Sequence, residues 1–240
     1  ERQVDGILLY GVPTPQEMQA VHHLGLPFVV LGNCDLPPGL SSMEVDVEDG
    51  VRRGMDHLFA LGHRRIGLVS EVFETRFFRQ IRHAYEESFR TYGYERRPEW
   101  IQESGRIREG GKAPTEALLA LPDVPTAILA TAERVAYGVI QTLQSRGLGV
   151  PQDVSVISLS SDIAYRPLPL IERIECNITF FVRSAVKMLL ERVANPAIPP
   201  VKTMMGLELV HGETCGPVRG AAGSGQDRVV SPSAPLDNRG

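Results

Sequence analysis

The sequence has little cysteine and no long apolar segment. Its three cysteines, Cys34, Cys176 and Cys215, are far apart and form no Cys-x-x-Cys pair. This usage excludes a disulfide framework and is typical of reduced thiols. No apolar run approaches the ~20 residues that a membrane-spanning helix needs, so we expect no membrane partner. Lys and Arg total 25 against 29 Asp and Glu. The chain therefore lacks the basic excess of a domain that binds nucleic acid through its own surface.

Motifs of the common enzyme classes are also absent. There is no GxGxxG, GxxxxGK[ST], HExxH or GxSxG, which removes the usual nucleotide, zinc-protease and serine-hydrolase signatures. No two of the six histidines stand at metal-ligand spacing. Carboxylate pairs such as Glu48-Asp49 lie in helical patterns, where the helix dipole favours them in the first turn. We therefore expect a protein that is not an enzyme, with no catalytic residue, cofactor or metal.

Apolar runs alternate with helical patterns along most of the chain. The pattern predicts strands at 7–10, 27–32, 41–47, 65–70, 126–130, 153–159, 171–176 and 201–211. It predicts helices at 13–25, 47–61, 76–92, 113–121, 132–147 and 178–194. Strands separated by single helices indicate an α/β fold with parallel sheets and flanking helices. Residues 219–240 are small, polar and without apolar period, which predicts a disordered tail.

Two segments carry a family resemblance. They are VDVEDGVRRGMDHLFALGHRRIGLVS (45–70) and SRGLGVPQDVSVIS (145–158), supported by LVHGETCGP (209–217). Together they resemble the effector-binding core of the LacI/GalR family of bacterial transcriptional regulators, over residues 3 to about 217. The resemblance implies the two-lobed fold of periplasmic sugar-binding proteins, with crossover strands and a ligand cleft between the lobes.

The resemblance also implies a division into lobes. We expect residues 1–61 and 175–198 in the N-terminal lobe, and residues 62–174 and 199–218 in the C-terminal lobe. Gly62 is then a helix C-cap, and Gly-His-Arg-Arg is the turn between the lobes, with His63 structural and no ligand. The family's helix-turn-helix and its first strand–helix–strand–helix unit are not found in the sequence. We therefore expect an incomplete N-terminal lobe, with DNA contacted only through a missing N-terminal domain.

Ligands of open parallel sheets bind beyond the carboxyl ends of the strands. This rule and the loop composition predict a ligand-binding set of Tyr10, Asn33, Asp46, Glu71, Arg79, Arg106, Glu133, Ser160, Ser161 and Asp162. For two of these, the alternative is a purely structural role: Glu133 as a first-turn acid and Arg106 as a solvated loop charge.

Three polar anchors of the family's sugar-binding members are altered. Ile81 stands at the arginine of the Arg-x-x-Gly-aromatic motif, Ala132-Glu133 replace Asn-Asp, and Ser158 to Ser161 replace Gly-aromatic-Asp-Asp. Since sugar selectivity depends on such groups, these changes argue against an ordinary free sugar.

Three functions remain open. The first is the sensor module of a cytoplasmic regulator such as a repressor, a homodimer that binds a carbohydrate-like or other small effector. The second is a periplasmic solute-binding protein of a transporter. The third is a paralogue that only dimerises. Helices 76–92 and 132–145 are candidate interfaces, and the stripe Tyr85, Phe89 and Tyr92 is either interface or core.

Overall fold

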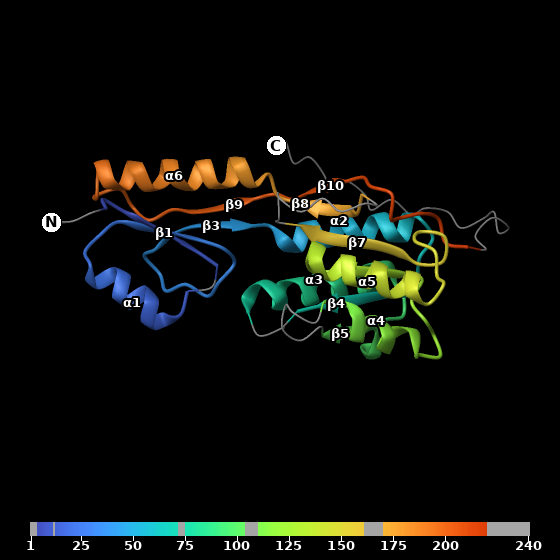
Figure 1. Cartoon of the computed structure of the whole chain (residues 1–240). Helices are drawn as coiled ribbons and strands as arrows, with labels where there is room; N and C mark the ends of the chain where they lie inside the picture. Colours follow the sequence, from blue (N-terminus) through green and yellow to red (C-terminus); the bar gives the residue numbers. More distant parts are fainter. Residues whose placement is uncertain (1–3, 12, 72–74, 104–109, 161–169, 220–240) are drawn as a thin grey trace, which may run out of the picture.

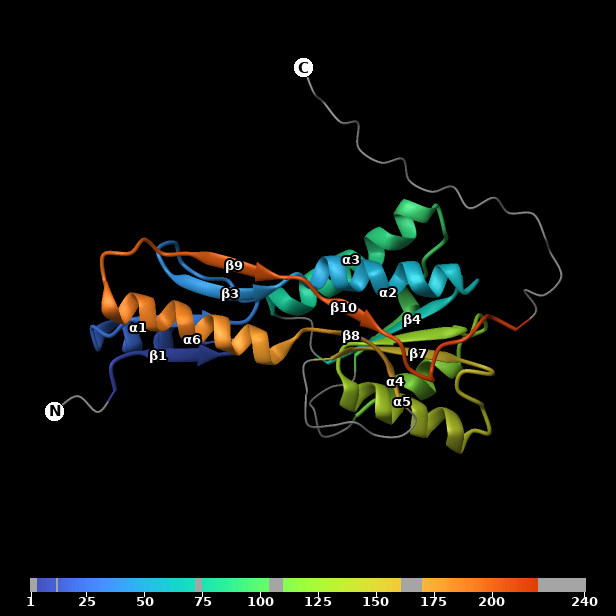
Figure 2. The same cartoon turned by 90° about the horizontal axis from the view of Figure 1, so that it is seen from above.

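The computed structural model describes residues 4–11, 13–71, 75–103, 110–160 and 170–219, which form two α/β lobes placed end to end (Figures 1 and 2). We call the lobe at the left of Figure 1 lobe 1 and the other lobe 2. Each lobe is built on its own sheet, of four strands in lobe 1 and six in lobe 2 among the described residues. The predicted α/β class with parallel sheets and flanking helices is confirmed.

Lobe 1 is a parallel sheet between two helices. Its strands, in spatial order, are β1 (Ile7–Tyr10), β2 (Phe28–Leu31), β3 (Ser41–Val45) and β9 (Lys202–Met205). Helix α6 (Ile178–Ala194) covers one face, and α1 (Pro15–His23) lies on the other (Figure 1). Alternate side chains of β2 serve the two faces: Val29 packs in the α6 core and Val30 in the α1 core. This period of two is what a sheet covered on both faces requires.

Lobe 2 repeats this layering on a larger scale. Its strands run β10-β8-β7-β6-β4-β5 across the sheet, and β10 is antiparallel to its neighbour while the others are parallel. The strand bounds are β4 (Ile66–Ser70), β5 (Ile101–Glu103), β6 (Ala127–Ala130), β7 (Ser155–Ser160), β8 (Glu172–Glu175) and β10 (Glu208–Val210). The helices are α2 (Val47–Ala60), α3 (Arg76–Tyr92), the 3-10 turn η1 (Pro98–Trp100), α4 (Lys112–Leu119) and α5 (Glu133–Ser145).

Two hydrophobic cores fill lobe 2. Leu129 of β6 packs with α2 and α3, and its neighbour Ile128 packs with α4 and α5. Burial of each such aliphatic side chain contributes about 1.5–3 kcal/mol. Of the stripe expected on α3, Tyr85 and Phe89 belong to the core because they are fully buried, whereas Tyr92 is exposed. The short strand β5 and the turn η1 were not predicted from the sequence.

Three crossovers join the lobes, and their positions correct two expected boundaries. The first crossover runs from β3 into α2, the second from β8 into α6, and the third from β9 into β10. Helix α2 belongs to lobe 2, because its apolar face packs against α3 and β8. The boundary expected at residue 62 therefore moves to the end of β3. The run 201–211 is two strands in different sheets, separated at Gly206, so residues 202–205 belong to lobe 1.

The turn at Gly62 ends α2 as the sequence predicts. Gly62 has a φ of +91°, a conformation that favours glycine. Its N–H donates to the carbonyl of Phe59 at 3.0 Å, and the N–H of His63 donates to that of Leu58 at 3.0 Å. These two bonds are the Schellman arrangement, which satisfies carbonyls left over at a helix C-terminus.

His63 has the structural role that we predicted. Its side chain is buried, and Nε2 lies 3.0 Å from the carbonyl of Gly216 and 3.1 Å from Ser155 Oγ. Since a carbonyl only accepts, Nε2 carries the proton, and Nδ1 accepts from Thr126 Oγ1 at 3.0 Å. Burial lowers the pKa of this imidazole. The neutral ring therefore fastens β6, β7 and the segment after β10 to the turn.

The two arginines of the turn stay on the protein surface next to it. Arg64 donates to the carbonyl of Phe59 at 2.9 Å and stacks over the ring of Tyr94 at 4.3 Å. Arg65 donates through Nε to the carbonyl of Val124 at 3.0 Å. Both arginine side chains thus donate hydrogen bonds to nearby backbone carbonyls.

Among the residues that the structure describes, no helix is both long and apolar enough to cross a membrane.

Candidate ligand site at the interlobe junction

The junction between the lobes lies at the carboxyl ends of the strands. Crossovers leave from the carboxyl ends of β3 and β9 in lobe 1 and of β8 in lobe 2. Because the neighbouring strands β1, β2, β4, β6 and β7 run parallel to these, their carboxyl ends face the same junction. This is the position at which open α/β sheets bind ligands.

On the lobe 2 side, buried polar atoms gather after β4. Ser70 is the last residue of β4, Glu71 follows it, and Thr75 precedes α3. Ser70 Oγ, Glu71 Oε1 and Thr75 Oγ1 are buried and have no hydrogen-bond partner among the described residues. Glu71 Oε1 lies 3.9 Å from Nη2 of the exposed Arg134. Buried polar atoms of native proteins are usually paired, so three such atoms in six residues mark this edge as a candidate site.

The next strand adds two buried polar residues. Thr131 follows β6, and its Oγ1 accepts from the N–H of Glu71 at 3.4 Å. Glu133 is the first residue of α5 and is buried. A carboxylate in a first helical turn is favoured by the helix dipole, so the structural alternative for Glu133 has a physical basis.

On the lobe 1 side, a carboxylate that the sequence analysis missed holds the lobes together. Glu44 of β3 is 1% exposed, and its oxygens lie 2.8 Å from Arg76 Nη1 and 2.8 Å from Lys202 Nζ. Arg76 is the first residue of α3, so this ion pair crosses from lobe 1 to lobe 2. The available signal was a charged residue inside the strand predicted at 41–47, which the structure places at Ser41–Val45.

Asn33 occupies the same contact layer and uses its side chain structurally. Its Nδ2 donates to the carbonyl of Val45 at 2.7 Å and to Gln80 Oε1 at 3.0 Å. Its Oδ1 accepts from the N–H of Val45 at 2.9 Å. Asn33 therefore fixes the β2–β3 connection to the crossover strand and to α3 of lobe 2.

The other predicted site residues are distributed as follows. Asp46 is the N-cap of α2, where Oδ1 accepts from the N–H of Asp49 at 3.1 Å. Arg79 forms an exposed ion pair with Asp35 at 2.6 Å. Tyr10 ends β1 with an exposed side chain, and Ser160 is the last residue of β7. Arg106, Ser161 and Asp162 lie outside the described residues. The structure thus brings Glu71 and Glu133 to the lobe 2 edge, and Asn33, Asp46 and Arg79 to the layer between the lobes.

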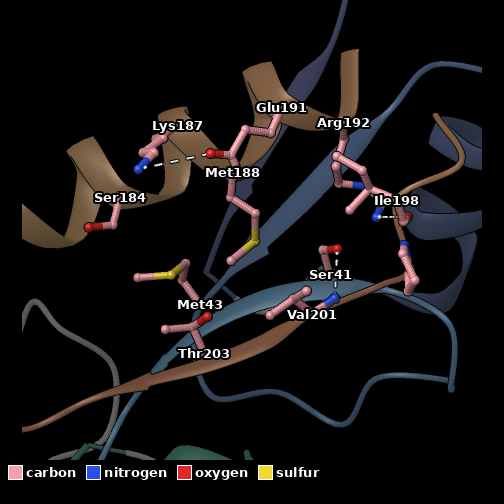
Figure 3. Close-up of a pocket in the computed structure, with 11 residues that line it drawn as sticks. Ser41, Met43, Ser184, Lys187, Met188, Glu191, Arg192, Ile198, Val201 and Thr203 are labelled. Carbon is pink, nitrogen blue, oxygen red and sulfur yellow. Dashed lines mark hydrogen bonds and ion pairs between the residues drawn. The ribbon is translucent and has the colours of Figure 1, made fainter. Parts of the chain in front are cut away.

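A concavity lies inside lobe 1, between α6 and the β3–β9 pair (Figure 3). Its volume is about 290 Å³, and Met43, Met188 and Val201 contribute apolar walls. Lys187 faces Glu191 at 3.9 Å, Arg192 Nη1 donates to the carbonyl of Ile198 at 3.1 Å, and Arg192 Nε is buried without a partner among the described residues. The junction is the stronger candidate, because its three buried oxygen atoms, likewise without a hydrogen-bond partner among these residues, lie at the carboxyl edge of a sheet.

Two α/β lobes, three crossovers and polar groups at the facing strand ends define a protein of the periplasmic-binding-protein-like class. Comparison with known families agrees, because residues 55–215 match the periplasmic binding protein-like domain. The HTH-type transcriptional repressor CytR of Escherichia coli K12 is 26% identical over 214 residues, covering 87% of this chain and 62% of CytR. The repressor PurR of Glaesserella parasuis is 30% identical over 200 residues, covering 80% of this chain and 57% of PurR.

Solved structures show the same fold. A LacI family transcriptional regulator from Enterococcus faecium with bound ribose superposes with a TM-score of 0.80 at 20% identity, over 90% of this chain and 81% of that one. The chain belongs to the periplasmic binding protein-like domain family, and it is similar to LacI-type repressors and regulators. It spans less than two thirds of the length of the curated repressors named above.

Proposed function

We propose that this chain is the ligand-sensing part of a LacI-type transcriptional regulator, and that a small polar molecule binds at the interlobe junction. The observation that carries this proposal is the set of three buried polar atoms at Ser70, Glu71 and Thr75. They lie at the carboxyl edge of the lobe 2 sheet, where this fold class places ligands. The similarity to repressors supports a regulator over the solute-binding protein of a transporter.

The chemistry of these groups indicates the kind of ligand. A carboxylate oxygen and two hydroxyls all accept hydrogen bonds, and the carboxylate adds negative charge. A ligand with several hydroxyl or amine N–H donors fits them, which includes polyols, nucleosides and amino compounds. Because the family's sugar anchors are replaced at Ile81 and Ala132, we expect a compound other than a common free hexose.

The cross-lobe contacts supply the element that a ligand would bias. The N-terminal half of α3 is held to lobe 1 by Arg76–Glu44 and Gln80–Asn33. Ser70, Glu71 and Thr75 directly precede this helix. A ligand that binds them better in one lobe arrangement shifts the population toward that arrangement. We propose that a homodimer transmits this shift to a DNA-binding domain outside these residues, in the cytoplasm, with the outer face of α5 as a candidate interface.

The test is a thermal-shift screen of sugars, sugar phosphates, nucleosides and amino acids. A compound present at 100 times its Kd stabilises the folded state by about 2.7 kcal/mol. The stabilisation should shrink in Ser70→Ala and persist in Thr91→Ala, a matched change on the exposed side of α3. If the protein is folded and no class of compound changes its Tm, the ligand-sensing proposal is contradicted, and a paralogue that only dimerises is favoured.

Two further measurements separate the remaining alternatives. Analytical ultracentrifugation with and without the stabilising compound reports the oligomeric state, and a monomer under all conditions would overturn the dimer. The coding DNA upstream of the codon for Glu1 distinguishes a regulator from a transport protein. An in-frame helix-turn-helix supports the proposal, whereas a secretory signal sequence contradicts it.

A further inference from the structure

We propose that His57, Glu172, His211 and Cys215 form a binding site for a divalent transition metal ion, with Zn²⁺ the best fit. The four residues come from three separate parts of lobe 2. His57 lies in the last turn of α2, Glu172 opens β8, and His211 and Cys215 follow β10. The site is separate from the interlobe junction. Glu172 is at the start of β8, whereas the carboxyl end of β8 faces the junction.

Two imidazoles contact one carboxylate oxygen, and a thiol lies nearby. Glu172 Oε1 lies 3.0 Å from His57 Nε2 and 2.8 Å from His211 Nδ1, and the two imidazole centroids are 5.5 Å apart. The ligand atoms of His57, Glu172 and Cys215 all lie within 4.8 Å of one another. In tetrahedral zinc sites the nitrogen and oxygen ligands are about 2.0–2.2 Å from the metal and hence about 3.3 Å from each other. The distances from Glu172 Oε1 to the two imidazole nitrogens are close to this value.

His57 brings a buried nitrogen to the same carboxylate. Its Nε2 lies 3.0 Å from Glu172 Oε1. A neutral imidazole nitrogen in this position can bind the same ion as the oxygen.

An outer layer of hydrogen bonds holds the ligands in place. The N–H of Gly212 donates to Glu172 Oε2 at 2.7 Å, which leaves Oε1 for the ion. Thr214 Oγ1 accepts from the N–H of Glu172 at 2.8 Å and donates to the carbonyl of Val156 at 2.6 Å. Metal sites depend on such second contacts for ligand orientation. Here they fix β8 and the segment after β10 against β7.

The charges balance for a dication. Binding of M²⁺ would release the thiol proton to solvent, giving a thiolate, a carboxylate and two neutral imidazoles around the ion, a neutral set. Thiolate with imidazole selects zinc-like ions over Mg²⁺ and Ca²⁺.

The test titrates the tag-free, metal-free chain with Zn²⁺ by calorimetry and with Co²⁺ by absorption spectroscopy. We expect one equivalent per chain and a thiolate-to-cobalt charge-transfer band. Cys215→Ser should abolish the band. His211→Ala should weaken Zn²⁺ binding by at least about tenfold, and since the His211 side chain is 74% exposed, this variant should fold normally.

Matched controls are His83→Ala, an exposed imidazole on α3, and Cys34→Ser, a buried thiol in lobe 1. Both should bind like the wild type, with circular dichroism confirming the fold of every variant. The proposal is overturned if Zn²⁺ binding does not saturate near one equivalent, or if affinity survives His211→Ala unchanged. A cobalt band that depends on Cys34 in place of Cys215 would also overturn it.

Discussion

Glu44 of lobe 1 and Arg76 of lobe 2 form an ion pair at 2.8 Å across the junction, with the carboxylate almost fully buried. Arg76 also lies 3.4 Å from the carbonyl of Cys34. One arginine at the start of α3 thus links that helix to both β3 and the β2–β3 connection. The pair therefore connects α3, which follows Ser70, Glu71 and Thr75 in the chain, to lobe 1.

Removing Arg76 should therefore destabilise the protein. Loss of one partner from a buried ion pair costs about 3–5 kcal/mol, and because Lys202 still contacts Glu44, we expect the low end, about 3 kcal/mol, for Arg76→Leu. Arg79→Leu is the control, since its pair with Asp35 is exposed and should be worth about 0–1 kcal/mol. Urea unfolding measures both, and equal losses would contradict the special role of Arg76.

Ser70→Ala should separate binding from stability. The Ser70 hydroxyl is buried without a partner among the described residues, so its removal should leave the free energy of unfolding unchanged or raise it by up to about 1 kcal/mol. Ser88→Ala is the comparison, because that buried hydroxyl donates to the carbonyl of Ala84 at 2.7 Å and should cost about 1 kcal/mol. Thermal unfolding without ligand decides. A loss in Ser70→Ala as large as that in Ser88→Ala would show that Ser70 Oγ is structurally engaged.

The buried His63 should make stability depend on pH. Its folded pKa is lowered from the ordinary value of 6.5, so the unfolded chain binds the proton more readily. The contribution of the neutral ring is fully present above about pH 6.5, and it is lost as pH falls from there toward the folded pKa. We expect the free energy of unfolding to decrease between pH 7 and pH 5, less steeply in His63→Asn. Denaturant unfolding in the presence of a metal chelator, repeated across this pH range, tests the prediction. It would be refuted if the free energy of unfolding changed equally with pH in the wild type and in His63→Asn.

Gly138→Ala should be destabilising although alanine favours helices. A Cβ at Gly138 of α5 would lie 2.5 Å from the backbone nitrogen of Gly111, which immediately precedes α4. The propensity gain of about 1 kcal/mol is smaller than the cost of separating the two helices, so we expect a net loss of about 1–2 kcal/mol. Gln141→Ala, on the exposed side of the same helix, is the control and should be neutral or stabilising. An unchanged or increased Tm in Gly138→Ala would contradict the close approach.

Much of the fold follows from local sequence signals. The bounds of α3 at residues 76 and 92 match the predicted helix, and the Gly62 turn ends α2 where expected. These features depend on side-chain period, on capping and on a glycine at positive φ, which are properties of neighbouring residues. The α/β class follows in the same way from strands separated by single helices.

The lobe to which each element belongs was decided by tertiary packing. Helix α2 joins lobe 2 because its apolar face finds α3 and β8, and the strand 201–211 divides because its halves pair with β3 and β8 in different sheets. The same holds for the Glu44–Arg76 pair and for the proposed metal site. Residues 57, 172, 211 and 215 have no common spacing in the chain, and only the packing of α2 against β8 and β10 brings their side chains together. The spacing of apolar residues can be read from neighbouring positions in the sequence. Contacts between distant residues form only once the sheets and helices have packed.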